Sequence, residues 1–196
     1  MSSLIDSRRR FLTASTTVVG AAGAAAAGWP FIASWRPSER ALARGAPVVV
    51  DVTKLEAGRQ VTVEWRGKPV WVLRRTAEML ETLPKLKDKL RDPDSRVTSQ
   101  QPTYARNEHR SIQPEYLVVV ALCTHLGCSP TFRPQLAPAN LGPEWLGGYF
   151  CPCHGSRFDL AGRVYQGVPA PTNLVVPPHQ YLHNTLIQIG EAQEEA

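Results

Sequence analysis

The stretches "ALCTHLGCSP", which begins at Ala121, and "YFCPCHGSRF", which begins at Tyr149, decide how the rest of the chain is interpreted. Together they contain all four cysteines of the 196-residue chain, and each contains one histidine. We call them the first box and the second box. The six residues are Cys123, His125, Cys128, Cys151, Cys153 and His154. Thiol and imidazole groups concentrated in two short segments indicate a metal centre, disulfide bonding or both.

Four arrangements of these six residues are open. Zinc sites usually pair cysteine with cysteine and histidine with histidine, whereas each box mixes the two residue types. Two disulfides, or an iron–sulfur cluster held by four cysteines, would leave both histidines without a role. The fourth arrangement uses every residue, because one cysteine and one histidine from each box hold a 2Fe–2S cluster while the remaining cysteines form a disulfide.

The segments "CTHLGC" and "CPCHGS" resemble the two boxes of the Rieske iron–sulfur proteins, in the branch that contains a disulfide. The resemblance is specific in the boxes and extends more loosely over the whole chain. It implies two ligands for each iron, Cys123 and Cys151 on one and His125 and His154 on the other, and a disulfide between Cys128 and Cys153. Neutral imidazoles in place of thiolates ease reduction, and Rieske centres lie at about −150 to +300 mV against about −400 mV for plant-type clusters.

Residues next to the ligands are expected to tune the cluster. Gly127 and Gly155 permit tight turns that bring backbone N–H groups near the sulfurs. The resemblance implies that Leu126 shields the cluster and that the Ser156 hydroxyl donates to a bridging sulfide. Phe158 stands where high-potential members carry a tyrosine that donates to a ligand cysteine, so we expect a moderately lower potential.

A further segment, "GVPAPTNL", resembles the proline loop that covers the cluster in this family. Its candidate residues are Gly167, Pro169, Ala170 and Pro171. Three other histidines lie outside both boxes and are assigned no role: His109, His179 and His183.

The N-terminal segment predicts export and anchoring. "SRRRFL" at Ser7–Leu12 resembles the twin-arginine export signal. Residues 11–35 carry no charge, and as a helix they would reach about 37 Å, longer than a hydrocarbon core of about 30 Å. We expect a cytoplasmic N-terminus at residues 1–10 and a retained transmembrane anchor at 11–35 rather than a cleaved signal peptide. The positive-inside rule then places the cluster domain in the periplasm, on the inner membrane of a bacterium.

The charge distribution argues against nucleic-acid binding. The net charge is +5, but residues 1–45 hold six arginines against Asp6 and Glu39. Most of the excess positive charge therefore belongs to the N-terminal segment, and the rest of the chain lacks the basic face that nucleic-acid binding requires.

The remaining chain predicts a mostly β fold, a Rieske-type antiparallel β domain with a small cluster-binding subdomain, besides the one transmembrane helix. We expect a flexible hinge linker at 36–47, the Rieske domain at 48–196 and its subdomain at about 122–172. Strands are expected at 47–52, 60–65, 69–75, 115–122, 163–167, 173–178 and 185–190. Residues 76–90 look helical, with Pro84 dividing them, and 91–114 read as a surface loop.

The resemblance extends to the iron–sulfur subunits of the ubiquinol–cytochrome c reductase family. It implies an electron-transfer subunit of an oxidoreductase, which oxidises ubiquinol at the cytochrome b site and passes the electron to cytochrome c1 within a dimeric complex. His154 would hydrogen-bond the quinol and accept its proton. The alternatives are the Rieske small subunit of arsenite oxidase, a soluble Rieske ferredoxin and a non-redox zinc module.

Overall fold

The computed structural model describes residues 2–39, 41 and 45–192. The chain divides into two compact units, residues 1–43 and 44–196, and each is described by itself. Residues 40 and 42–44 of the expected hinge lie outside the described residues, so the hinge stays a prediction.

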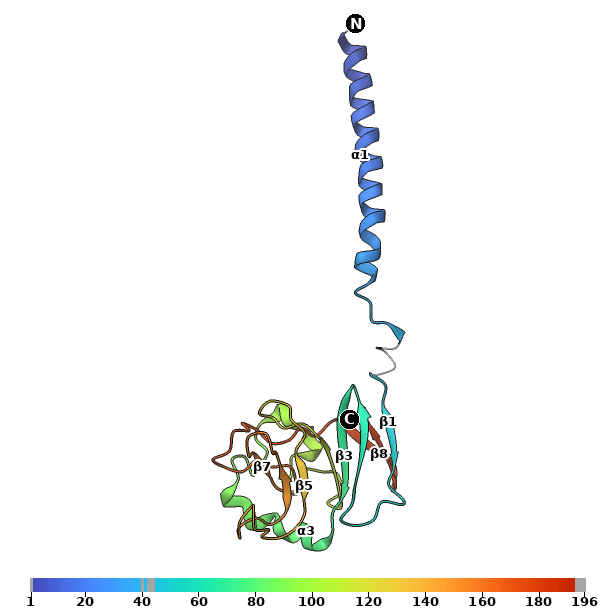
Figure 1. The fold of residues 1–196 in the computed structure, drawn as a ribbon. Helices are drawn as coiled ribbons and strands as arrows, with labels where there is room; N and C mark the ends of the chain where they lie inside the picture. The colour runs from blue at the N-terminus through green and yellow to red at the C-terminus, as the bar shows by residue number, and fades with distance from the viewer. Residues whose placement is uncertain (1, 40, 42–44, 193–196) are drawn as a thin grey trace. The chain divides into compact units, whose positions relative to one another are not determined.

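The first unit contains one long helix, α1 (Ser2–Ala33), drawn in blue in Figure 1. Its stretch Ile5–Ala33 is long and apolar enough to cross a membrane. The hydroxyls of Thr13, Thr16 and Thr17 donate to the carbonyl four residues earlier, so these polar groups are satisfied within the helix. The helix starts before the expected anchor and ends three residues after Pro30.

The described part of the second unit forms three antiparallel sheets of three strands each, in the orders β1-β9-β8, β2-β3-β4 and β5-β6-β7. The strands are β1 (Val48–Asp51), β2 (Gln60–Trp65), β3 (Lys68–Arg74), β4 (Tyr116–Val120), β5 (Thr131–Arg133), β6 (Gly148–Phe150), β7 (Arg157–Phe158), β8 (His179–His183) and β9 (Leu186–Ile189). Between β3 and β4 come the helix α3 (Ala77–Thr82) and the 3₁₀ helices η1 (Pro84–Lys89), η2 (Thr98–Gln100) and η3 (Thr103–Ala105). In Figure 1, β5 and β7 lie in the loop-rich part of this unit, away from β1 and β8. The mostly β fold class is therefore confirmed.

The sheet β2-β3-β4 separates two hydrophobic cores. On β4, Leu117 and Val119 point into a first core that also contains Cys123 and Cys151, while Val118 and Val120 point into a second core. The second core contains Ile187 and Ile189 of β9 and Val50 of β1. Because both faces of β4 are covered, its sequence is a continuous apolar run rather than an alternating one.

Several local predictions are confirmed. The strands expected at 60–65 and 69–75 are present as β2 and β3, and they form a hairpin in which Trp65 pairs with Lys68 across a two-residue turn. In this turn Arg66 and Gly67 have φ of 51° and 71°. Pro84 divides the helical region between α3 and η1, since a proline removes an N–H donor and favours the first position of a new turn.

Other local predictions are wrong. The segments 163–167 and 173–178 are not strands; the first makes only isolated bridges, Phe158↔Val164 and Leu90↔Tyr165. In the second, the consecutive prolines 177 and 178 lack the N–H donors that a ladder requires. Strands β5, β6, β7 and β8 were not expected, because two to five residues are too few for periodicity to reveal.

The segment 91–114 is not simply a surface loop. It contains η2 and η3 and buries Ser95, Ala105, Arg110 and Ser111. Arg110 is buried because backbone carbonyls from elsewhere in the fold accept its hydrogen bonds, which no local pattern predicts.

Candidate metal centre

The first box is a closed turn that begins just after β4. The backbone N–H of Cys123 donates to the carbonyl of Cys128 at 2.7 Å, and the N–H of Gly127 donates back to the carbonyl of Cys123 at 2.9 Å. Gly127 has a φ of +80°, a conformation that costs other residues about 1–2 kcal/mol. Gly127 therefore has the tight-turn conformation that the sequence predicted for it.

The second box, which follows β6, repeats this pattern. The N–H of Cys151 donates to the carbonyl of Ser156 at 2.8 Å, and the N–H of Gly155 donates to the carbonyl of Cys151 at 2.9 Å. Gly155 has a φ of +78°. In each box the turn thus begins with a buried cysteine, Cys123 or Cys151, and the histidine follows two or three residues later.

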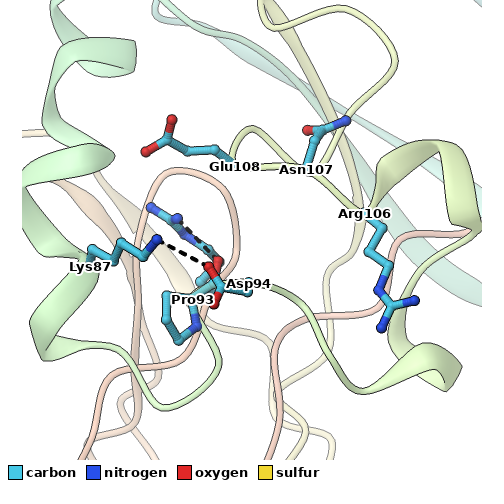
Figure 2. Close-up of a pocket in the computed structure, with 7 residues that line it drawn as sticks. Lys87, Pro93, Asp94, Arg106, Asn107 and Glu108 are labelled. Atoms are coloured by element: carbon cyan, nitrogen blue, oxygen red, sulfur yellow. Dashed lines mark hydrogen bonds and ion pairs between the residues drawn. The ribbon is translucent and has the colours of Figure 1, made fainter.

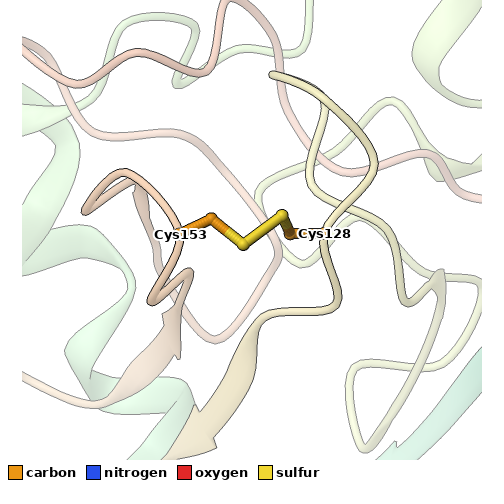
Figure 3. The surroundings of a disulfide bond; sticks show 2 residues. All are labelled: Cys128 and Cys153. Atoms are coloured by element: carbon orange, nitrogen blue, oxygen red, sulfur yellow. A yellow bond between two sulfur atoms is a disulfide. The ribbon is translucent and has the colours of Figure 1, made fainter.

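A disulfide joins the two boxes. It links Cys128 to Cys153, as Figure 3 shows, and confirms the pairing that the resemblance implied. Cys123 and Cys151 are free cysteines, 3% and 2% exposed. The rings of His125 and His154 lie 4.7 Å apart between centroids and nearly perpendicular to each other. The fold therefore brings two free thiols and two imidazoles together from separate loops.

These residues fit a 2Fe–2S cluster. The Nδ1 atom of His125 is buried and has no hydrogen-bond partner among the described residues, which suits a nitrogen that ligates a metal. A zinc site is a poorer match. The sulfurs of Cys128, Cys151 and Cys153 lie within 4.8 Å of one another, but two of them form the disulfide and are not thiolates.

The Cys123 thiol lies in a mixed environment. Burial, and to a lesser extent the neighbouring Cys151 thiol, raise its pKa above the ordinary value, whereas hydrogen bonds from the backbone N–H of His125 and from the Ser156 hydroxyl oppose that rise. A thiol that ligates iron must be deprotonated, so these two donors stabilise the form that binds. The sequence singled out Ser156 for its hydroxyl, and the structure places that hydroxyl beside the free thiol.

The expected proline loop contacts both boxes. The N–H of Ala170, which is fully buried, donates to Oγ of Ser156 at 3.0 Å. The hydroxyl of Thr124 in the first box donates to the carbonyl of Thr172 at 2.7 Å. Gly167 has a φ of +70° where the loop begins, and Pro169 and Pro171 are exposed. Sequence reasoning missed Thr124, although its position between two candidate ligands was a usable signal.

Leu126 and Phe158 lie in contrasting surroundings. Leu126 is 72% exposed at the tip of the first box, whereas Phe158 is fully buried and pairs with Tyr149 between β7 and β6. Phe158 and Tyr149 belong to the first core together with Cys123 and Cys151. The Tyr149 hydroxyl is buried without a hydrogen-bond partner among the described residues, and burial raises its pKa.

A pocket elsewhere on the second unit contains none of the predicted site residues. Its volume is about 260 Å³, and Figure 2 shows its charged walls. The pocket is lined by Lys87, Pro93, Asp94, Arg106, Asn107, Glu108 and Arg163. Lys87 forms an ion pair with Asp94 at 3.3 Å, so these two charges of the lining neutralise each other.

The histidines outside the boxes occupy other environments. His179 is buried; its Nδ1 lies 2.9 Å from the carbonyl of Pro177, and its backbone N–H donates to the Tyr104 hydroxyl. Burial lowers the pKa of His179 and also that of His109. His183 is exposed at the end of β8.

The small antiparallel sheets and the two boxes joined by a disulfide define a Rieske protein. A family model described as "Rieske [2Fe-2S] domain" matches residues 46–178. A second model, described as "Ubiquitinol-cytochrome C reductase Fe-S subunit TAT signal", matches residues 4–38. The chain belongs to the family of ubiquinol–cytochrome c reductase iron–sulfur subunits, which are components of an oxidoreductase complex.

Curated relatives with that name match nearly the whole chain. The protein from Allochromatium vinosum is 59% identical over 189 residues, covering 96% of this chain and 91% of the relative. Those from Blastochloris viridis and Rhodospirillum rubrum are 44% and 42% identical over 186 residues, covering 93% and 94% of this chain and 92% of each relative. These matches do not favour the arsenite oxidase alternative.

Proposed function

We propose that this chain is the membrane-anchored subunit that oxidises ubiquinol at a cytochrome b site and delivers the electron to cytochrome c1. The main observation in support is that the rings of His125 and His154 contact each other in two loops that a disulfide joins. Each of these loops also contains one buried free cysteine. We assign Cys123 and Cys151 to one iron of a 2Fe–2S cluster and His125 and His154 to the other. When bound, a cluster ligated in this way supplies one-electron chemistry at a potential raised by its neutral imidazoles.

His154 is the residue that would meet the quinol. Its side chain is exposed, whereas the thiols are buried beneath the tips of the loops. An imidazole that would ligate through one nitrogen keeps the other for a hydrogen bond, and an oxidised cluster would favour loss of the proton from that nitrogen. Once this nitrogen is deprotonated, His154 can accept a hydrogen bond from a quinol hydroxyl and then its proton. The exposed Leu126 side chain supplies apolar surface at the same tip, which suits the ring of a quinol.

The ligand assignment is tested by comparing two exposed histidines. His154→Asn should abolish the EPR signal of the reduced full chain and remove iron and acid-labile sulfide. His183→Asn, a matched change outside the boxes, should leave all three unchanged. A His154→Asn protein that keeps the wild-type spectrum would contradict the assignment, and with it the proposed route of the proton.

The membrane setting is the second part of the proposal. The helix α1 is long enough to cross the bilayer, its arginines stay in the cytoplasm, and the cluster domain lies in the periplasm on the bacterial inner membrane. The names of the relatives support cytochrome b and cytochrome c1 as partners, and we place the chain within a dimeric complex. Cytochrome b and cytochrome c1, which are both haem proteins, should co-purify with the chain from detergent-solubilised membranes.

The segment 36–47 is proposed as the hinge on which the cluster domain moves between the two partners. One redox centre must reach a quinol at the membrane and an acceptor farther away, and a flexible linker permits both. Proline substitutions within residues 41–46 should slow the reduction of cytochrome c1 and leave the EPR spectrum of the cluster unchanged. Equal turnover in the stiffened and wild-type complexes would count against the hinge.

A further inference from the structure

Three arginines in the described part of the second unit are buried far more completely than arginine usually is. Arg75, Arg110 and Arg163 are 2%, 0% and 1% exposed, and we call them the arginine cluster. Arg75 follows strand β3, Arg110 lies in the segment 91–114, and Arg163 follows the second box. They come from three distant parts of the sequence, so only the fold brings them together.

The arginine cluster surrounds one turn, residues 159–163, which connects β7 to the segment before the proline loop. Arg75 donates to the carbonyl of Leu160 at 3.1 Å. Arg110 donates to the carbonyls of Ala161 and Gly162, both at 3.2 Å. Three consecutive carbonyls of the turn therefore accept hydrogen bonds from buried guanidinium groups.

The third arginine pairs with the acid of the same turn. Arg163 Nε lies 2.7 Å from Oδ2 of Asp159, and both side chains are almost completely buried. Asp159 is the only acidic side chain among the described buried residues. Burial lowers the pKa of Arg75 and Arg110 to about 10, so both remain protonated at neutral pH. Three buried positive charges thus face one buried negative charge, and the half-buried Asp92 is a second carboxylate within electrostatic reach of Arg110.

The segment 91–114 covers part of the arginine cluster and supplies acceptors for it. Arg75 also donates to the carbonyls of His109 and Pro114, and Arg163 donates to the carbonyl of Pro93 at 3.4 Å. Residues of this segment form walls of the pocket that Arg163 lines, as Figure 2 shows for Asp94, Arg106, Asn107 and Glu108.

The turn is continuous with the core that contains the free cysteines. Leu160 and Ala161 belong to the first core together with Cys123 and Cys151. Tyr149, in the same core, is within electrostatic reach of both Arg75 and Asp159. The charges and the two thiols are therefore separated by protein interior, where screening is weaker than in water.

We propose that the arginine cluster is a fixed positive charge that raises the reduction potential of the 2Fe–2S centre. The inference rests on the proposed ligand set. Reduction adds one negative charge to the centre, and a buried excess of positive charge stabilises that state. At an effective dielectric constant of about 20, a unit charge would change a one-electron equilibrium constant by about sixfold if its separation from the centre were about 15 Å. This corresponds to about 45 mV.

The test uses substitutions of opposite sign in the detergent-solubilised full chain. Arg110→Gln removes a positive charge and should lower the equilibrium constant for reduction about sixfold. Asp159→Asn removes the negative charge and should raise it by a similar factor. Arg110→Lys keeps the charge and should stay close to the wild type. Arg96→Gln, which removes an exposed charge from the same segment, should change the constant less than twofold.

Each potential is measured by EPR-monitored redox titration, with iron and acid-labile sulfide determined in the same sample. Distortion of the turn would shift both charge-removing variants in one direction, whereas a fixed charge shifts them in opposite directions. If Arg110→Gln yields no folded protein, Arg75→Gln takes its place as the variant that removes a positive charge. Asp159→Asn still shows in which direction the reduction potential shifts when a negative charge is removed. If the variants contain the cluster but their potentials are unchanged, or shift in the same direction, this inference is wrong while the proposed ligand set still stands. A wild-type chain without iron would overturn the proposed ligand set as well.

Discussion

The substitution Phe158→Tyr is expected to raise the reduction potential of the cluster. Phe158 is fully buried, and it packs in the same core as Cys123 and Cys151. Relatives with high potentials are expected to carry at this position a tyrosine whose hydroxyl donates to a ligand cysteine. A hydrogen bond to a thiolate stabilises the reduced state more, because that state carries more negative charge on sulfur.

The size of the shift follows from the energy of one hydrogen bond. A neutral hydrogen bond contributes about 1 kcal/mol net. If that energy acts on only one redox state, a one-electron couple at 59 mV per tenfold change in its equilibrium constant shifts upward by about 40 mV. The extra oxygen must also fit a closely packed site, which is expected to lower the free energy of unfolding by about 1–3 kcal/mol. The potential and the stability should therefore move in opposite directions.

The assay is an EPR-monitored redox titration of the full chain, combined with urea unfolding. Phe150→Tyr is the matched control, because Phe150 lies on the neighbouring strand β6 but packs against a different core, which contains Trp145 and Tyr165. It should leave the potential within a few millivolts of the wild type. An unchanged potential in Phe158→Tyr, or an equal rise in Phe150→Tyr, would refute the reasoning.

Three further predictions concern stability. Replacing Cys128 and Cys153 together by serine opens a loop with a sequence separation of 25 and should lower the free energy of unfolding by about 3.5 kcal/mol, as urea titration would detect. His179 has a pKa lowered by burial, so the unfolded state binds more protons; stability is complete above pH of about 6.5 and should fall as the pH drops below it. His179→Gln should reduce the loss of stability below pH of about 6.5, with His109 accounting for part of what remains, and an unchanged slope would contradict the assignment. Gly148→Ala, at a φ of +149°, places a Cβ against the carbonyl oxygen of Phe158 in β7 and should cost more than about 3 kcal/mol, whereas Gly67→Ala, at a φ of +71° and in open space, should cost about 1–2 kcal/mol.

Much of the candidate site could be predicted because its chemistry is local. Each box holds its two cysteines, its histidine and a glycine within six residues, and the hydrogen bonds that close the turn lie within the same six residues. The strands β2, β3 and β4 were also predictable, since runs of β-branched residues bounded by turns have a clear signature. The short strands β5 and β6 carry no such signature and depend on the partners that pair with them.

The pairing of the cysteines shows where spacing stops being informative. Four cysteines allow three connectivities, and the sequence separations alone do not choose among them. The choice of Cys128 and Cys153 came from a resemblance, and the structure agrees because the ends of β4 and β6 bring those two loops together. Thr124 and Ala170 illustrate the same limit, since their contacts join the boxes to the proline loop across many residues of sequence.

Thiols and imidazoles in two boxes were enough to indicate a metal centre, disulfide bonding or both, and an uncharged stretch after paired arginines indicated a membrane anchor, because these properties follow from residue type and local spacing. The 2Fe–2S cluster was implied by the resemblance to the Rieske proteins. Which thiols remain free, and how three arginines come to be buried around one turn, depended on the tertiary structure. The physical reason is that a buried charge is tolerated only where acceptors surround it, and here the carbonyls that surround Arg75 come from residues 109, 114 and 160. These acceptors are far apart in the sequence and leave no local sequence pattern, so only the folded chain brings them together around Arg75.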